Sequence, residues 1–272
     1  MQGDIGTDAR EAALQCDLSG RTAIVTGAAT GIGSAIAVRY AESGANVVVD
    51  YHADEDYRDA MGLIDTIRRN GGNARLVRAD MTIEDDVDTL VASAVEYYGS
   101  VDVLVCNAGI EESHSVVDMP LEVWEGILRV NLTGSFLCAR AAARAMISRG
   151  RGGRIINISS VHEELAMPQN AAYTASKGGM RMFMRTLSLE LAPFAITVNN
   201  IAPGAIATRI NKDVRDNPEQ RSKLLSEIPL GRIGDPREVA NLALYLASSA
   251  ASYVTGATYV IDGGLLQSAE GL

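Results

Sequence analysis

Two side chains four residues apart, Tyr173 and Lys177, form a pattern that could transfer a proton. They fall in an amphipathic stretch, 172–192, that predicts a helix, so this spacing puts them on one face about 6 Å apart along the axis. A tyrosine with an ordinary pKa of about 10 is a poor base at neutral pH, but an adjacent ammonium favours its phenolate. The same spacing is common on plain helix surfaces, so the pair indicates acid–base chemistry only if other residues support it.

A glycine-rich turn, TGAATGIG over 26–33, follows an expected strand and opens an expected helix. Its glycines, Gly27, Gly31 and Gly33, permit a tight turn, let backbone N–H groups approach a pyrophosphate, and let the helix pack close to the sheet. The spacing is neither GxGxxG nor a P-loop, because no Lys-Ser/Thr pair follows the last glycine. A merely flexible turn is the alternative, and the strand–turn–helix context favours the phosphate site.

These residues need a scaffold, and from residue 21 the chain alternates β-branched runs with longer amphipathic stretches. Runs such as VVV and VLV are apolar throughout, which is typical of strands buried on both faces between parallel neighbours with right-handed helical crossovers. The pattern predicts an α/β fold: a single-domain, doubly wound Rossmann fold with a seven-stranded parallel sheet and helices on both faces. The expected strands are 22–26, 46–50, 74–79, 101–106, 154–158, 196–201 and 257–261. The expected helices are 32–43, 57–70, 84–98, 121–148, 172–192 and 237–246.

Residues 1–19 are acidic without apolar periodicity and predict a flexible N-terminal arm, so the domain is expected over residues 20–272. The longest stretch without a strand, 203–235, is expected to be a lid over a site.

The composition excludes several classes of function. Thirty-four acidic against 24 basic residues give a net charge of −10, which disfavours binding to nucleic acid or anionic membranes. No apolar run has the length of about 20 residues that a membrane span needs, and no signal peptide pattern is present. Cys16, Cys106 and Cys138 are odd in number and widely spaced, which fits a reducing cytoplasm. The three histidines have no metal-ligand spacing, so no metal is expected.

Further motifs then resemble those of the short-chain dehydrogenase/reductase family. Besides the glycine turn, they include NAG after the fourth strand, Asn131, Ser160 thirteen residues before Tyr173, and YTASK at 173–177. PG at 203–204 and DGG at 262–264 complete the set, in the order in which the family has them. The resemblance covers residues 20–266.

The resemblance implies an enzyme that transfers hydride between an alcohol and a nicotinamide cofactor. Asn131, Ser160, Tyr173 and Lys177 would be its catalytic residues, with Asn131 ordering a water and Lys177 also binding the nicotinamide ribose. It further implies a homotetramer built on long helices and the C-terminal strand, acting on a small-molecule substrate. The implied cofactor-binding residues are Gly27, Thr30, Gly31, Ile32, Gly33, Tyr51, His52, Asp80, Met81, Asn107, Ala108, Gly109, Tyr173, Lys177, Pro203, Gly204 and Ile206.

Selection between NAD and NADP should depend on the residues that end the second strand. The family's NAD-selective members carry an acid at the position of Tyr51, whereas here Asp50 comes one residue early and should point to the other side of the strand. His52 occupies the position at which the glucose dehydrogenases of the family have a basic residue near the phosphate of NADP. Thr30 occupies the position at which many NADP-dependent members have a basic residue in the glycine turn. Use of both NAD and NADP is therefore expected, with Asp80 at the adenine.

Within the family, the loops are most similar to those of bacterial glucose 1-dehydrogenases, in segments such as NAGIE and SSVHE. This favours oxidation of an aldose to its lactone, with Glu111, Ser160, His162 and Tyr173 at the substrate and Glu163 and Gln169 adding polarity. Reduction of a ketoacyl, steroid or other carbonyl substrate is the alternative within the family. A non-catalytic NAD(P)-binding sensor is the alternative outside it.

Overall fold

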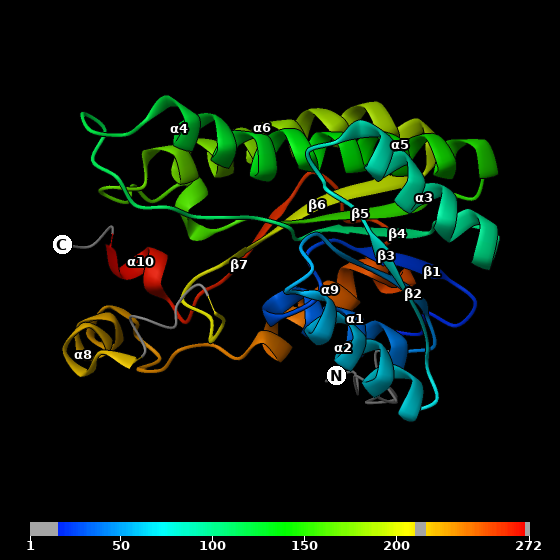
Figure 1. Ribbon diagram of the computed structural model, residues 1–272, viewed down its shortest axis with the longest axis horizontal. Helices are drawn as coiled ribbons and strands as arrows, with labels where there is room; N and C mark the ends of the chain where they lie inside the picture. Colours follow the sequence, from blue (N-terminus) through cyan, green and yellow to red (C-terminus); the bar gives the residue numbers. More distant parts are fainter. Residues whose placement is uncertain (1–15, 210–215, 270–272) are drawn as a thin grey trace, which may run out of the picture.

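A computed structural model describes residues 16–209 and 216–269, and a seven-stranded parallel sheet forms its centre (Figure 1). The strand order is β3-β2-β1-β4-β5-β6-β7, so the sheet winds outward in both directions from the β1/β4 boundary. The strands are β1 Thr22–Val25, β2 Asn46–Tyr51, β3 Asn73–Arg78, β4 Val103–Cys106, β5 Gly153–Ile158, β6 Ile196–Pro203 and β7 Thr258–Ile261. The predicted α/β fold is confirmed, and each expected strand begins and ends within about two residues of the observed one.

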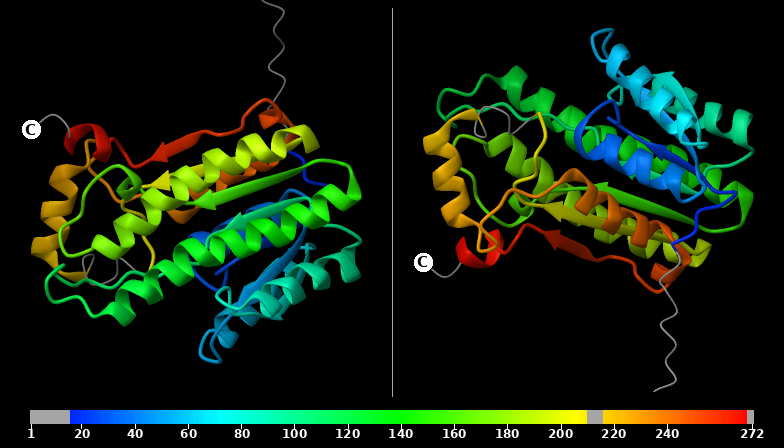
Figure 2. Two further views of the ribbon diagram at one scale, coloured as in Figure 1. Left: turned by 90° about the horizontal axis from the view of Figure 1, so that it is seen from above. Right: turned by 90° about the horizontal axis from the view of Figure 1, so that it is seen from below.

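Helices cover both faces of this sheet (Figure 1). One face carries α1 Gly31–Glu42, α2 Tyr57–Arg69 and α9 Pro236–Ala247. The other carries α3 Glu84–Tyr98, α4 Leu121–Leu128, α5 Gly134–Arg149 and α6 Ala171–Leu191. Two further helices, α8 Pro218–Glu227 and α10 Leu265–Ala269, lie beyond the end toward which the strand arrows point (Figure 2).

The sheet is buried on both sides because its strands supply apolar side chains to two separate cores. Along β2, Val47 and Val49 belong to the core beneath α1, α2 and α9, whereas Val48 belongs to the core beneath α3 and α5. This alternation explains why the strands read as continuous apolar runs. It also leaves the strand ends, rather than the sheet faces, as the place for a site.

Two expectations about the elements need correction. The expected helix 121–148 is interrupted by a π-helical turn at Arg129–Thr133, between α4 and α5. The segment 203–235, which stays a predicted lid, contains α8, and its residues 210–215 lie outside the described residues. Of the expected arm 1–19, residues 1–15 also lie outside them, whereas Leu18 is fully buried and its N–H donates to the Ser43 carbonyl. The packed domain therefore includes Leu18 rather than beginning at residue 20.

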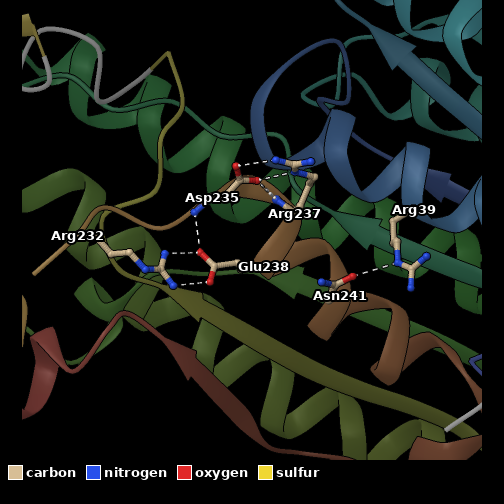
Figure 3. Close-up of polar contacts among 6 residues, drawn as sticks. All are labelled: Arg39, Arg232, Asp235, Arg237, Glu238 and Asn241. Atoms are coloured by element: carbon tan, nitrogen blue, oxygen red, sulfur yellow. Dashed lines mark hydrogen bonds and ion pairs between the residues drawn. The ribbon is translucent and has the colours of Figure 1, made fainter. Parts of the chain in front are cut away.

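Polar contacts at the start of α9 fix the end of the segment that carries α8 (Figure 3). Asp235 caps α9 in a capping box with Glu238, and the Arg232 guanidinium donates to both Glu238 carboxylate oxygens at 2.8 and 2.7 Å. These bonds hold the pKa of Glu238 down to about 2. Arg39 of α1 donates to Asn241 of α9, so the same helix is also tied to its neighbour on the sheet.

Candidate functional site

A cavity of 780 Å³ lies at the carboxyl ends of the strands and runs from the glycine turn to α6. It lies at the β1/β4 boundary, where doubly wound sheets bind their ligands. Most of the residues singled out from the sequence line it. They are Gly27, Thr30, Gly31, Ile32, Tyr51, His52, Asp80, Met81, Asn107, Ala108, Gly109, Glu111, Ser160, His162, Tyr173, Lys177, Pro203, Gly204 and Ile206. Gly33 and Asn131 do not.

The glycine turn is held against the end of β4 by close backbone contact. Gly27 and Gly31 have φ of +62° and +64°, a conformation that glycine adopts at little cost. A Cβ on Gly27 would lie 2.8 Å from the Ala108 Cα, and one on Gly33 would lie 2.5 Å from the Asn107 Nδ2. That Asn107 nitrogen donates to the carbonyls of Thr26 and Gly27 at 2.9 and 3.0 Å. Gly33 therefore acts through close packing rather than as a wall of the cavity.

Asp50 supports the turn from beneath. Its side chain is buried and Oδ1 accepts a hydrogen bond from the Gly27 N–H at 2.6 Å. Burial raises the pKa of Asp50 to about 7, although the bond from Gly27 acts in the opposite direction. The turn thus rests on a carboxyl that is half protonated near neutral pH.

The side of the cavity beyond β2 is polar. The His52 Nδ1 lies 3.7 Å from the Asp80 Oδ2, and Asp80 also accepts hydrogen bonds from the N–H and hydroxyl of Thr82, both at 2.8 Å. Partial burial raises the pKa of Asp80, but the Thr82 bonds and His52 outweigh it and hold that pKa below its usual range. A carboxylate and an imidazole therefore face each other where the second and third strands end.

Tyr173 and Lys177 both line the cavity and lie close together, as their spacing predicts. The Lys177 Nζ lies 5.4 Å from the centre of the Tyr173 ring and donates to the Ile158 carbonyl at 3.0 Å. Burial raises the pKa of Tyr173 to about 12, against a hydrogen bond with the Ser160 side chain. Burial also lowers the pKa of Lys177 to about 8. The expected phenolate is therefore not favoured by the chain alone, because the desolvation of Tyr173 outweighs its polar contacts.

Asn131 lies in the π-helical turn and is fully buried. Its Oδ1 accepts from the Ile110 N–H at 2.8 Å, and its Nδ2 donates to the Ile110 carbonyl at 2.9 Å and to the Ser176 hydroxyl at 3.1 Å. These bonds clamp the loop after the NAG motif onto α6. The side chain expected to order a water thus acts here on the backbone of Ile110.

Glu111 and His162 form the polar end of the cavity beside Tyr173. The His162 ring meets the Tyr173 ring edge-on at 6.2 Å, and burial raises the pKa of Glu111. Glu163 and Gln169, which the sequence placed with them, do not line the cavity. Glu163 points instead to Asn200 on β6, and Gln169 accepts from the His114 N–H through its backbone carbonyl.

Sequence reasoning missed the apolar wall opposite, which includes Met167, Leu224 and Leu265. Leu224 lies on α8 and Leu265 begins α10, two helices that were not expected. Arg209 also lines the cavity and pairs with Asp59 of α2. The only sequence signal for these lining residues was the long strand-free segment 203–235. Their contacts depend on how that segment folds back over the strand ends.

Comparison with known proteins decides the family. The enoyl-(acyl carrier protein) reductase family model matches residues 27–266. Glucose 1-dehydrogenase 2 of Bacillus subtilis (strain 168) is 45% identical over 250 residues, which are 92% of this chain and 96% of that protein. The chain belongs to the short-chain dehydrogenase/reductase family. As a member, it is an NAD(P)-dependent oxidoreductase, and the alternative of a non-catalytic sensor is set aside.

Other family members that resemble this chain act on different substrates. The L-rhamnose 1-dehydrogenase (NAD(P)(+)) of Azotobacter vinelandii is 44% identical, with 90% of this chain and 96% of that protein covered. The 3beta-hydroxysteroid dehydrogenase 1 of Eggerthella lenta is 43% identical, with 92% and 95% covered. The structure of a gluconate 5-dehydrogenase from Burkholderia cenocepacia J2315 in complex with NADP and tartrate has a TM-score of 0.87 at 36% identity, with 93% and 98% covered.

The geometry of the cavity fits the dinucleotide that this family uses. The glycine turn has no side chain between its backbone and the cavity at Gly27 and Gly31, and α1 begins within it, at Gly31, with its N-terminal amides directed to that end. The Thr30 side chain makes no capping bond to these amides. Within 16–209 and 216–269, no helix is long and apolar enough to cross a membrane, and no three potential metal ligands gather.

The buried carboxyl of Asp50 makes folding stability depend on pH. Its pKa is about 7 in the folded chain against an ordinary value of 3.8, so the folded state holds the proton more tightly. The stability that this site contributes is complete below about pH 4 and is lost as the pH rises to about 7. Asp50→Asn keeps an acceptor for the Gly27 N–H and cannot ionise. The free energy of unfolding of the variant, relative to that of the native protein, should therefore rise by roughly 3 to 4 kcal/mol between about pH 4 and pH 7.5.

Denaturant unfolding of both proteins across this range measures the difference. The exposed Asp54, changed to Asn, is the control and should show no such trend. A difference between Asp50→Asn and the native protein that stays constant with pH would contradict the buried, proton-binding state.

Proposed function

We propose that the protein oxidises the anomeric hydroxyl of an aldose, glucose or a close relative of it, to the lactone while NAD or NADP is reduced. The polar end of the cavity carries this proposal. The His162 Nδ1 lies 3.0 Å from the Leu165 carbonyl, and a carbonyl only accepts, so Nδ1 holds the proton. In the neutral ring, Nε2 is then an acceptor, as is the Glu111 carboxylate. A ring of hydroxyl donors satisfies both acceptors, and the relatives named for glucose and rhamnose support the assignment.

The reaction is assigned to the three side chains that meet at this end. Ser160 and Tyr173 share a hydrogen bond, so an anomeric hydroxyl between them contacts both. Tyr173 takes the proton of that hydroxyl, and Ser160 holds its oxygen in line. Lys177 supplies positive charge beside the Tyr173 ring and also binds the nicotinamide ribose. The bound nicotinamide supplies the hydride acceptor. Asn131 contributes by holding the Ile110 loop in place.

The remaining predicted residues hold the rest of the cofactor. The backbone of the glycine turn binds the pyrophosphate, Asp80 and Met81 border the adenine, and Asn107 to Gly109 with Pro203, Gly204 and Ile206 enclose the nicotinamide end. Tyr51 and His52 flank the ribose, and Asp50 is engaged with the Gly27 N–H rather than with the ribose hydroxyls. Both NAD and NADP are therefore accepted.

Oxidation of a hydroxysteroid, or reduction of the corresponding ketone, is the second candidate. Met167, Leu224 and Leu265 give one wall of the cavity an apolar character that a sugar does not need. The relative named as a 3beta-hydroxysteroid dehydrogenase is only two percentage points less identical than the glucose enzyme. The chemistry at Ser160 and Tyr173 would be the same.

The proposal extends to a homotetramer in the cytoplasm. Apolar side chains remain exposed on α5, α6 and β7, among them Phe136, Met182, Leu189 and Val260, which suits contacts between subunits. Met180 and Met184, which lie on α6 with Met182, are buried in the chain itself. Light scattering should report about four chain masses. Three free thiols, Cys16, Cys106 and Cys138, support a reducing compartment.

Tyr173→Phe tests the proton transfer. The variant keeps the ring and loses only the hydroxyl, so cofactor binding should persist while kcat falls by about 10² to 10⁴. Cofactor titration and steady-state rates separate the two effects. Tyr245→Phe on α9, outside the cavity, is the control and should keep its kcat. Near-native turnover by Tyr173→Phe would remove the residue from the reaction.

His162→Leu tests the sugar contact. Loss of one acceptor for a hydroxyl should raise the KM for glucose about tenfold or more, equivalent to about 1.4 kcal/mol, with cofactor affinity unchanged. His114 does not line the cavity and pairs with Glu112, so His114→Leu is the matched control. If both variants keep the native KM for glucose, the polar end does not bind the sugar.

A further inference from the structure

A buried carboxylate outside the cavity lies close to the machinery assigned above. The Glu163 side chain is only 1% exposed and belongs to the short 3-10 helix Val161–Glu163 that follows Ser160. Its Oε2 accepts from the Asn200 Nδ2 at 3.2 Å, and its Oε1 lies 3.5 Å from the Arg181 Nε, an ion pair without a hydrogen bond. Burying a charge this deeply is costly unless other charges balance it.

The orientation of the Asn200 amide is fixed from its other side. The Asn157 Nδ2 on β5 donates to the Asn200 Oδ1 at 3.0 Å, so the Asn200 Nδ2 is left to donate to Glu163. Asn157 is followed by Ile158, whose carbonyl accepts from Lys177. The carboxylate, through Asn200 and Asn157, and the ammonium, through Ile158, are thus both tied to the end of β5.

The charges of Glu163, Glu164 and Arg181 do not cancel, and Lys177 can supply the positive charge that is missing. Arg181 is shared between Glu163 and Glu164, so these three side chains together carry one negative charge. Tyr173, Lys177 and Arg181 follow one another at intervals of four on α6 and share a face. A protonated Lys177 makes the cluster neutral. Within the described residues, no ion pair joins a carboxylate to the Lys177 Nζ, so Glu163 acts on the ammonium through space rather than by direct contact.

We propose that Glu163 is a positioning residue that keeps Lys177 in its ammonium form, and so sets the pH range over which Tyr173 can exchange its proton. This rests on the roles assigned to Tyr173 and Lys177 in the proposed function. The groups that face Lys177 are Glu163 from the 3-10 helix, Glu111 from the loop after β4, and Tyr173 from α6. Burial lowers the pKa of Lys177, and Glu163 and then Glu111 oppose that shift. Arg181 lies four residues after Lys177 on α6, so its like charge opposes the ammonium and partly offsets the effect of Glu163.

Two variants should move the pH profile of kcat/KM in opposite directions. Glu163→Gln keeps the size and the acceptor for Asn200 but removes the charge, so Lys177 loses its proton at lower pH and the alkaline limb should move down by about half a pH unit or more. Arg181→Met removes the competing cation and should move that limb up. Glu163→Asp, which keeps the charge, should restore the native limb.

Glu190→Gln is the matched control, because Glu190 is an exposed carboxylate on the same helix α6 and does not belong to this cluster. Its limb should stay near the native position. A purely structural role for Glu163 would lower kcat/KM equally at every pH, and an unmoved limb in Glu163→Gln overturns the proposal. If Glu163→Gln does not fold, Arg181→Met tests the proposal instead. An alkaline limb that stays in place or moves to lower pH in Arg181→Met overturns the proposal.

The profile is measured with whichever alcohol the native protein oxidises. Absence of aldose oxidation by the native protein would therefore count against the proposed substrate alone. The relative positions of the limbs would still decide the role of Glu163.

Discussion

Lys177 is only 4% exposed, and its Nζ donates to the carbonyl of Ile158, the last residue of β5. A buried ammonium is stable only where carbonyl oxygens and negative charges surround it. This requirement ties α6 to the end of β5, and α6 in turn brings Tyr173 to Ser160. The same helix receives the Asn131 clamp through Ser176, so the loop that carries Glu111 is set by the same contacts. The positions of Tyr173, Ser160 and the Glu111 loop therefore depend on the place where the Lys177 ammonium can be buried.

The pKa values of Tyr173 and Lys177 show that a bound ligand must favour the ionised form of Tyr173. Tyr173, with a pKa of about 12, holds its proton at neutral pH, and Lys177, with a pKa of about 8, is close to losing its own. Positive charge brought into the cavity would favour the phenolate, since nearby opposite charge stabilises an ionised group. Proton exchange at Tyr173 therefore depends on the occupied cavity rather than on the chain alone. Asp50, protonated in part near pH 7 beneath the glycine turn, shows the same influence of burial at the other end.

Much of the fold could be predicted because it depends on the pattern of residues that are close together in the sequence. The apolar strands, the glycine turn and the Tyr173–Lys177 spacing depend on residues that are near one another in the chain, and all lie where they were expected. The interruption at Asn131 was missed because a π-helical turn has no distinct periodicity over five residues. Glu163 was expected to add polarity at the substrate, but its side chain is buried against Asn200 and Arg181 outside the cavity. The wall formed by α8 and α10 depends on long-range folding that no local pattern reports.

The cavity thus combines a polar end, where Glu111 and His162 present acceptors, with an apolar wall, and we propose that the substrate binds at the polar end. The most direct measurement is the rate of cofactor reduction by the native protein with a set of aldoses and a 3β-hydroxysteroid, compared as kcat/KM under the same conditions. An aldose should have the highest kcat/KM, and the steroid should be a poor substrate. Good turnover of the steroid together with no activity on any aldose would contradict this proposal.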